Sequence, residues 1–339
     1  MNLLQVGLGP VGRQIVRFAA ARPGVRLVGA VDPAPDLAGR DAGELSGAGR
    51  LGVVVQPRLD AALAHAPTRP DVAILTTVSD LRALEPQVAE LARAGLPVVS
   101  TCEALAHPWF TDPELARRLD AACRDRGVAC VGTGVNPGFL MDYLPLTLTA
   151  VCQRVDRIRV FRVQDASVRR IPFQEKIGAG LTLRQFRDRA DAGTLRHVGL
   201  TESMRMIAGR LGWELSRTTE SLDPVVAEKR ILSGHRPIEP GQARGVHQVG
   251  RGFVGREERI TLDFRAAVGE PGSYDRVEIV GEPNLESTIA GGVNGDIATC
   301  AIVLNAAAVI RQAQPGLRTM IDLPPIAFAP AAVPAPGAA

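Results

Sequence analysis

The chain has 339 residues, of which 46% are hydrophobic and 22% are charged, and its formal net charge is +3. This composition is typical of a globular protein of one large or two ordinary domains. It argues against nucleic-acid binding, because long basic runs are missing and only 4% of the residues are aromatic. No apolar run is long enough to span a membrane, and no signal peptide is recognisable. Five scattered cysteines without a CxxC pair favour reduced thiols without a metal site, so we expect a cytoplasmic protein.

The first 135 residues alternate between short apolar strands and amphipathic helices. Helices are expected between the strands, for example at LEPQVAELARAG, where a glycine ends the pattern. Alternation of this kind is typical of a parallel, doubly wound α/β sheet. The predicted strands are LLQVGL, RLVGAVD, DVAILTT, PVVS and VACVGTG.

A glycine loop, VGLGPVG, follows the first strand and places Gly7, Gly9 and Gly12 in GxGxxG spacing. Such glycines permit a tight turn and let a pyrophosphate approach the N-terminus of the next helix. Asp32 ends the second strand, where a carboxylate accepts hydrogen bonds from a ribose and disfavours a 2′-phosphate. We therefore predict a dinucleotide site for NAD, without excluding NADP. The alternative is a glycine-rich turn of another fold with Asp32 as a helix cap. The other loop residues expected at the cofactor are Leu8, Pro10 and Val11.

Small and hydroxyl side chains follow three later strands of this domain. Ligands of doubly wound sheets bind beyond the carboxyl ends of the strands, so these side chains are expected near the nicotinamide and its ribose. Helix capping by the hydroxyl residues explains some of them equally well. The candidates are Thr76, Thr77, Val78, Thr101, Cys102 and Asn136.

Glu103 stands where the strand Val98-Val99 has just ended, in the segment VVSTCEALAHPW. Ser100 and Glu103 have the spacing of a capping box, in which the glutamate accepts a hydrogen bond from the cap residue's N–H. However, Pro108 leaves little helix to cap. A partly desolvated glutamate at a strand end is also suited to general acid/base catalysis. Both roles stay open on the sequence alone.

After the segment NPGF the pattern changes to an alternation with period two. Strands are expected at 157–165, 258–268 and 274–282, with helices near 182–191 and 201–211. This indicates a smaller α+β domain with a half-exposed sheet over residues 136–295, following a first domain over 1–135. A helix that is apolar on nearly all sides starts residues 296–325, which we expect to pack back on the first domain. Residues 326–339 form a Pro/Ala-rich tail that we expect to be poorly ordered.

Arg162 lies on the apolar face of the strand 157–165, with Gln164 on the same face. A cation on a buried face needs a partner. The partner is either an internal carboxylate or the anionic group of a substrate, which a guanidinium binds as a bidentate fork. His197 lies in an expected loop, where a lone histidine carries little functional weight.

The chain resembles the 2,4-diaminopentanoate dehydrogenases and the related native NAD(P)-dependent amine dehydrogenases, and it is more distantly similar to dihydrodipicolinate reductases. The segments STCEALAHPW, TGVNPGF and LRTMIDLPP carry the resemblance specifically, and VGLGPVGRQI carries it less so. The resemblance covers about residues 3 to 325. The paired-histidine and lysine motif of dihydrodipicolinate reductases is not found, which argues against their reaction.

The resemblance implies a Rossmann domain, a smaller substrate and dimerisation domain, and a homodimer. It implies oxidative deamination of an amine or amino acid to a ketone and ammonia with NAD(P)⁺, and the reverse reductive amination. Glu103 would be the catalytic acid/base. Another imine or ketone reductase, or a non-catalytic NADH-binding protein, is the alternative. The residues expected at the polar end of the substrate are Asn136, Arg162, Gln164 and His197.

Overall fold

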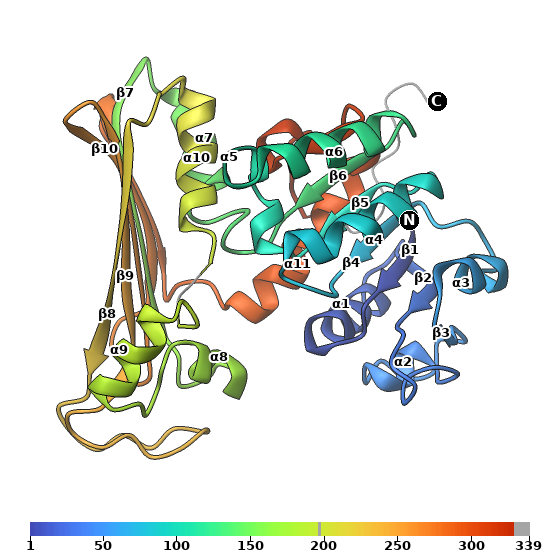
Figure 1. Cartoon of the computed structure of the whole chain (residues 1–339), viewed down its shortest axis with the longest axis horizontal. Coiled ribbons are helices and arrows are strands. Elements are labelled where there is room, and N and C mark those ends of the chain that lie inside the picture. The colour runs from blue at the N-terminus through green and yellow to red at the C-terminus, as the bar shows by residue number, and fades with distance from the viewer. Residues whose placement is uncertain (196–197, 329–339) are drawn as a thin grey trace. The chain divides into compact units, whose positions relative to one another are not determined.

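The computed structural model describes residues 1–195 and 198–328, and the chain divides into two compact units (Figure 1). The first unit combines Met1–Phe139 with the segment that begins at Gly295, and the second unit is Leu140–Asn294. His197 and residues 329–339 of the tail lie outside the described residues.

The first unit is built on a seven-stranded parallel sheet with the strand order β13-β6-β5-β4-β1-β2-β3. The chain starts in the middle of this sheet, winds outward to β3, and returns to add β4 on the other side of β1. The predicted doubly wound α/β fold is therefore confirmed, and its switch point lies between β1 and β4. The strands are β1 (Asn2–Val6), β2 (Arg26–Val31), β3 (Val55–Gln56), β4 (Val72–Leu75), β5 (Val98–Ser100), β6 (Ala129–Gly132) and β13 (Gly316–Arg318).

Helices cover both faces of this sheet, which explains why its strands are continuous apolar runs rather than alternating ones. Helix α4 shows how the sequence forms them: Asp80 caps its first turn by accepting from the Ala83 N–H at 2.8 Å, and Leu84 and Val88 on its inner face are buried. The helices are α1 (Pro10–Ala20), α2 (Ala42–Leu45), α3 (Leu59–His65), α4 (Leu81–Arg93), α5 (Pro108–Thr111), α6 (Pro113–Arg124) and α11 (Gly295–Val309). Short 3₁₀ turns are η1 (Glu103–Leu105), η3 (Ile310–Gln312) and η4 (Met320–Asp322).

Helix α11 returns to the first unit and packs against α1 and β5. Most of its length is buried, as expected for a helix that is apolar on nearly all sides. The Arg22 guanidinium, just beyond α1, donates to the Asn305 side-chain oxygen of α11 at 2.7 Å. None of the helices in residues 1–195 and 198–328 is long and apolar enough to cross a membrane.

The second unit is a six-stranded mixed sheet with the order β12-β11-β7-β10-β9-β8. Neighbouring strands are antiparallel except for β7 and β10, which run parallel. The predicted α+β class of this unit is confirmed. Its strands are β7 (Arg154–Asp165), β8 (Arg217–Val226), β9 (Ala243–Val254), β10 (Glu257–Ala267), β11 (Tyr274–Glu282) and β12 (Leu285–Ala290). Its helices are α7 (Tyr143–Leu148), η2 (Thr149–Val151), α8 (Ile171–Lys176), α9 (Leu183–Asp191) and α10 (Leu200–Leu211).

Helix α10 packs on one face of this sheet against β9 and β10, and Figure 1 shows α9 on the same side. The approach is close: a Cβ added at Gly250 would lie 3.2 Å from the Met204 terminal carbon, and one at Gly252 would lie 3.2 Å from Leu215. Glycines therefore replace apolar side chains at these inward positions of β9. Because they interrupt the period-two alternation, the sequence pattern did not predict this strand.

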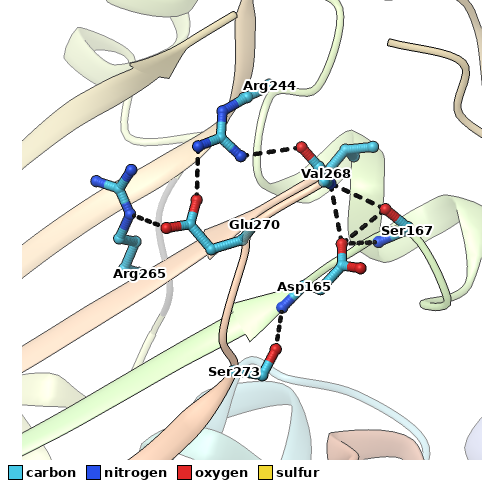
Figure 2. Close-up of polar contacts among 8 residues, drawn as sticks. Asp165, Ser167, Arg244, Arg265, Val268, Glu270 and Ser273 are labelled. Carbon is cyan, nitrogen blue, oxygen red and sulfur yellow. Dashed lines mark hydrogen bonds and ion pairs between the residues drawn. The ribbon is translucent and has the colours of Figure 1, made fainter. Parts of the chain in front are cut away.

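Glu270, in the turn after β10, ties the ends of two strands together (Figure 2). Its carboxylate accepts from the Arg265 Nε at 2.6 Å and pairs with the Arg244 Nη2 at 2.7 Å. On the other side of the turn, Asp165 at the end of β7 accepts from the Gly269 N–H at 2.9 Å. The Glu270 side chain is only 8% exposed, so its charge depends on both guanidinium groups.

We expect Glu270→Gln to lower the free energy of unfolding by about 1–3 kcal/mol, because two partly buried cations lose their shared anion. Urea unfolding followed by circular dichroism measures the change. Glu257→Gln is the matched control: this carboxylate is 69% exposed and pairs with Arg259 on the surface, so its loss should cost less than about 0.5 kcal/mol. Equal stability of wild type and Glu270→Gln would contradict the role of this ion network.

Candidate dinucleotide and catalytic site

The glycine loop between β1 and α1 depends on glycine at two positions. Gly7 has φ +90°, and a Cβ there would lie 2.8 Å from the Thr76 carbonyl oxygen. A Cβ at Gly12 would lie 2.0 Å from the Gly7 carbonyl oxygen. Gly9 is the extended cap residue of α1, and Pro10 occupies the first helical position. The loop thus brings the free N–H groups of a helix N-terminus close to the carboxyl end of β1.

Gln5, in β1, contacts this loop from the interior of the sheet. The sequence analysis did not predict it as a site residue. Its Nε2 donates to the Gly7 carbonyl oxygen and to the Thr76 hydroxyl oxygen, both at 2.9 Å. The Thr76 hydroxyl donates to the same Gly7 oxygen at 2.9 Å. The available signal was an amide in an otherwise apolar parallel strand, LLQVGL, directly before the loop.

Asp32 at the end of β2 uses one oxygen for the loop and one for its own turn. Its Oδ2 accepts from the Leu8 N–H at 2.7 Å, and its Oδ1 accepts from the Ala34 N–H at 3.0 Å. A carboxylate has about four acceptor positions, so capacity for further donors remains on both oxygens. Asp32 thus fixes the glycine loop and its own turn. It caps no helix, because the next helix, α2, begins at Ala42 and is capped by Asp41, so the helix-cap alternative does not apply.

A cavity of about 690 Å³ opens beside the glycine loop at the carboxyl ends of β1, β2 and β4. Among the residues predicted for the cofactor, those that line this cavity are Gly7, Gly9, Asp32, Thr76, Thr77 and Val78. Those that do not line it are Leu8, Pro10, Val11, Gly12, Thr101, Cys102 and Asn136. Leu8 is fully buried, and its N–H and carbonyl already bond to Asp32 and Arg13, so it supports the loop from inside the protein.

The far wall of the cavity was missed by the sequence analysis. It contains Pro57 and Arg58, which follow β3, and Asp60, which forms an ion pair with Arg58. Gln87 and Glu90 of α4 complete it. Pro57 and Arg58 were accessible to prediction, because they stand at the carboxyl end of a further parallel strand.

Glu103 is the first residue of η1, and Cys102 is the cap residue of that turn. The capping-box alternative therefore does not apply, since it requires the glutamate at the third helical position. The Ser100 hydroxyl instead donates to the Leu75 carbonyl at 3.0 Å and accepts from the Cys102 N–H at 3.1 Å. The Glu103 side chain is half-buried.

Gly132 at the end of β6 allows η1 to lie directly on the sheet. A Cβ at this position would be 2.5 Å from the Leu105 carbonyl carbon. The close packing places Glu103 beyond the carboxyl ends of β5 and β6, the edge at which ligands of such sheets bind.

Cys102 was predicted near the cofactor, but its side chain belongs to the core. Its thiol donates to the Ser79 carbonyl at 3.4 Å, and burial raises the pKa of the thiol to about 11. The thiol is therefore protonated at neutral pH and has little nucleophilic character. The backbone of Cys102 is also engaged, because the N–H donates to the Ser100 hydroxyl and the carbonyl accepts from the Leu105 N–H at 3.1 Å each.

Asn136 follows β6, and its peptide bond to Pro137 is cis. The residue is 7% exposed. The neighbouring Val135 N–H donates to the Thr299 hydroxyl of α11 at 3.3 Å, which anchors this segment within the first unit. In the parts of the chain that the structure describes, no three His, Cys, Asp or Glu side chains are arranged to bind a metal ion.

Arg162 has an internal carboxylate as its partner, one of the two alternatives that the sequence left open. Its Nη1 donates to Asp275 at 2.8 Å, and its side chain is 2% exposed. Its Nη2 and the Gln164 Nε2 donate to the Val293 carbonyl at 3.2 and 2.8 Å. Burial lowers the pKa of Arg162 to about 10 and raises the pKa of Asp275, while their attraction opposes both shifts. Arg162 and Gln164 thus orient the turn after β12.

Comparison with known proteins identifies the family of the chain. A model of the 2,4-diaminopentanoate dehydrogenase C-terminal domain matches residues 139–333, and a model of the dihydrodipicolinate reductase N-terminus matches residues 1–102. The 2,4-diaminopentanoate dehydrogenase of Acetoanaerobium sticklandii is 32% identical, covering 96% of this chain and 93% of that protein. An amine dehydrogenase of Streptomyces virginiae is 27% identical over 94% of each chain.

A solved amine dehydrogenase from Mycobacterium smegmatis has the same fold, with a TM-score of 0.83 at 24% identity over 98% of both chains. The C-terminal family model covers more than half of the sequence, and the Acetoanaerobium relative matches it over nearly its full length. The chain therefore belongs to the 2,4-diaminopentanoate dehydrogenase family of oxidoreductases.

Proposed function

We propose that the protein is an NAD-dependent amine dehydrogenase. It would convert an amine or amino acid of the 2,4-diaminopentanoate type to the ketone and ammonia, and catalyse the reverse reductive amination. The observation that carries the proposal is Glu103 on η1, at the same edge of the parallel sheet as the glycine-loop cavity. The likeness to 2,4-diaminopentanoate and amine dehydrogenases supports the reaction class.

The first unit has the features that a dinucleotide needs. The N-terminus of α1 suits a pyrophosphate, and the cavity lined by Asp32 suits the adenosine part. NAD⁺, when bound, would supply the hydride acceptor: once the substrate ammonium has released a proton, loss of the hydride from the amine-bearing carbon would leave an iminium on the substrate. The balance is then amine (as R₂CH–NH₃⁺), NAD⁺ and water to ketone, ammonium, NADH and one proton.

Glu103 would carry the proton transfers of this reaction. As a carboxylate it takes a proton from water while the water oxygen bonds to the iminium carbon, giving a carbinolamine. The protonated carboxyl then returns the proton to nitrogen. The C–N bond breaks as ammonia leaves, while the hydroxyl proton passes to the carboxylate as the C=O bond of the ketone forms, and ammonia finally takes up that proton as ammonium. In the reverse direction the same group assists addition of ammonia to the ketone. The half-buried position of Glu103 on η1, beyond the carboxyl ends of β5 and β6, supports this role.

We expect NAD to be preferred over NADP. Asp32 has acceptor capacity left for ribose hydroxyls. Asp60 and Glu90 add negative charge to the wall, and the one cationic lining residue, Arg58, is paired with Asp60. A 2′-phosphate would add a further negative charge to this wall.

We further infer that a second copy of the chain packs on the open face of the second unit's sheet. This face, opposite α10, centres on Phe161, with the Arg276 guanidinium 4.7 Å from the ring centroid. Charges of both signs surround it, such as Arg159 and Glu278 at 3.9 Å. A two-fold axis pairs a surface with itself, so a face carrying both signs is self-complementary.

Glu103→Gln should lower kcat in both directions by a factor of about 10²–10⁴, because the amide cannot exchange the proton. Wild type should oxidise NADH with a 4-oxo acid only when ammonium is present, whereas an alcohol dehydrogenase would need no ammonium. NADH binding by fluorescence titration should stay within about twofold of wild type. The control is Glu114→Gln, an exposed acid on α6, with normal turnover. Full activity of Glu103→Gln would refute the proposed acid/base role of Glu103.

Asp32→Ser should lower kcat/KM with NAD⁺ by at least about tenfold and shift the NAD⁺/NADP⁺ ratio towards NADP⁺. The variant loses acceptors for the ribose and also loses the charge that repels a 2′-phosphate. Initial rates with each cofactor measure the ratio. Asp36→Ser, an exposed acid after β2, should leave the ratio unchanged. An unaltered ratio in Asp32→Ser would show that another part of the wall selects the cofactor.

Phe161→Glu should convert the dimer to a monomer, because a two-fold axis brings two like charges together at the centre of the face. Light scattering coupled to gel filtration measures the mass. Thr261→Arg on the adjacent strand should act in the same direction, and Leu232→Asp, in the loop between β8 and β9, should not. A monomeric wild type would refute the dimer, and dimeric Phe161→Glu and Thr261→Arg variants would refute the choice of face.

A further inference from the structure

The peptide group between Gly7 and Leu8 is fixed at both ends by side chains from three different strands. Its carbonyl oxygen accepts from Gln5 of β1 and from Thr76 after β4, each at 2.9 Å. Its N–H donates to Asp32 after β2 at 2.7 Å. Rotation of this peptide plane would therefore break three hydrogen bonds at once.

This peptide needs such restraint more than an ordinary one. Gly7 has φ +90°, and glycine rotates into alternative conformations at little cost. Rotation would exchange the directions of the carbonyl and the N–H at the point where a pyrophosphate approaches the loop. A carbonyl oxygen directed at a phosphate is repelled, whereas N–H groups attract it.

The next two carbonyls of the loop are also engaged inside the protein. The Leu8 oxygen accepts from the Arg13 Nε at 2.7 Å, and the Gly9 oxygen accepts from the Arg13 N–H at 3.0 Å. All three consecutive carbonyls, from Gly7 to Gly9, are thus directed to donors of the chain itself. The side of the loop left for an anion is therefore the one that presents N–H groups.

Gln5 is the member of this arrangement whose presence packing does not explain. It is 1% exposed and lies beside Leu3 and Leu4, which are equally buried. An aliphatic residue at this position would avoid the cost of burying an amide. The amide's two N–H donors go to the Gly7 oxygen and to Thr76, whose own proton goes to the Gly7 oxygen. Both N–H groups of the Gln5 amide are thus used to hold the loop in place, one directly and one through Thr76.

We propose that Gln5 is a positioning residue for the pyrophosphate of the dinucleotide. It acts through the Gly7 carbonyl, together with Thr76, and it keeps the loop in its anion-binding form before the ligand arrives. The inference rests on the proposed dinucleotide function, and it adds a residue that itself touches no part of the cofactor.

The test is isothermal titration of Gln5→Met with ADP-ribose and with adenosine. Methionine fills a similar volume but has no donor. ADP-ribose, which contains the pyrophosphate, should bind about 10- to 100-fold more weakly than to wild type. Adenosine, which has no phosphate, should bind within about twofold. The KM for NAD⁺ should rise in parallel, while kcat at saturating NAD⁺ stays near wild type.

Two further variants complete the experiment. Gln56→Met makes the same change on β3 of the same sheet and should leave ADP-ribose binding unchanged. Thr76→Val removes the second donor to the Gly7 oxygen and should also weaken ADP-ribose selectively, which keeps the test valid if Gln5→Met does not fold. Wild-type affinity in both Gln5→Met and Thr76→Val overturns the proposal. An equal loss for ADP-ribose and adenosine also overturns it, because it indicates general distortion.

Binding is measured without any amine, so the outcome is separable from that of the proposed reaction. A wild-type protein that binds ADP-ribose but turns over no amine would refute the reaction and leave the role of Gln5 standing. A wild-type protein that binds no ADP-ribose would refute the role of Gln5 along with the cofactor.

Discussion

The close approach of α1 to the first strand is the constraint on which the dinucleotide site depends. At Gly12 the helix lies so near the Gly7 carbonyl that a single added carbon would be 2.0 Å from its oxygen. That carbonyl is surrounded by protein, and a buried carbonyl needs donors. Gln5 and Thr76 supply them, and Asp32 satisfies the N–H of the same peptide. The close approach of α1 therefore accounts together for the glycine spacing, for the amide of Gln5 in the strand and for the carboxylate of Asp32 at the end of the next strand.

In the second unit, too, each of the buried charges discussed above is matched by partners within the protein. The Arg162–Asp275 pair is removed from solvent on both sides, and both charges orient the backbone of the turn at Val293. Glu270 does the same for strand ends through Arg244 and Arg265. Paired buried charges contribute little net stability compared with apolar residues, but they tolerate few alternative arrangements. We infer that they determine the geometry of the turns more than they strengthen the core.

In the proposed catalysis, the strand ends of the first unit would hold the cofactor and the turn η1 would carry the acid/base Glu103. Strand order brings the ends of β1, β2 and β4 to one cavity, and Gly132 lets η1 carry Glu103 onto the same edge of the sheet. The glycine loop and Asp32 directly follow strands that are held by backbone hydrogen bonds of the sheet. The turn η1 has its own backbone hydrogen bonds, from the Leu105 N–H to the Cys102 oxygen at 3.1 Å and from the Ala106 N–H to the Glu103 oxygen at 3.2 Å. A site on such elements keeps its geometry before a ligand binds, which is the condition for electrostatic and proton-transfer catalysis.

The sequence by itself determined the alternation of strands and helices in the first unit and the glycine loop, because these depend on periodicity and on local backbone requirements. The family followed from the resemblance of whole segments such as STCEALAHPW. It did not decide the partner of Arg162, because Asp275 is 113 residues away and any buried anion satisfies the same pattern. It missed β9, where glycines make room for α10. It left Glu103 between two roles, and only the position of η1 removed the capping box. The role of Gln5 became visible only through its hydrogen bond to Thr76, which lies 71 residues later in the chain. Helix, strand and turn preferences depend on short segments of sequence. The partners of buried polar groups, in contrast, are decided only when distant segments meet in the folded chain.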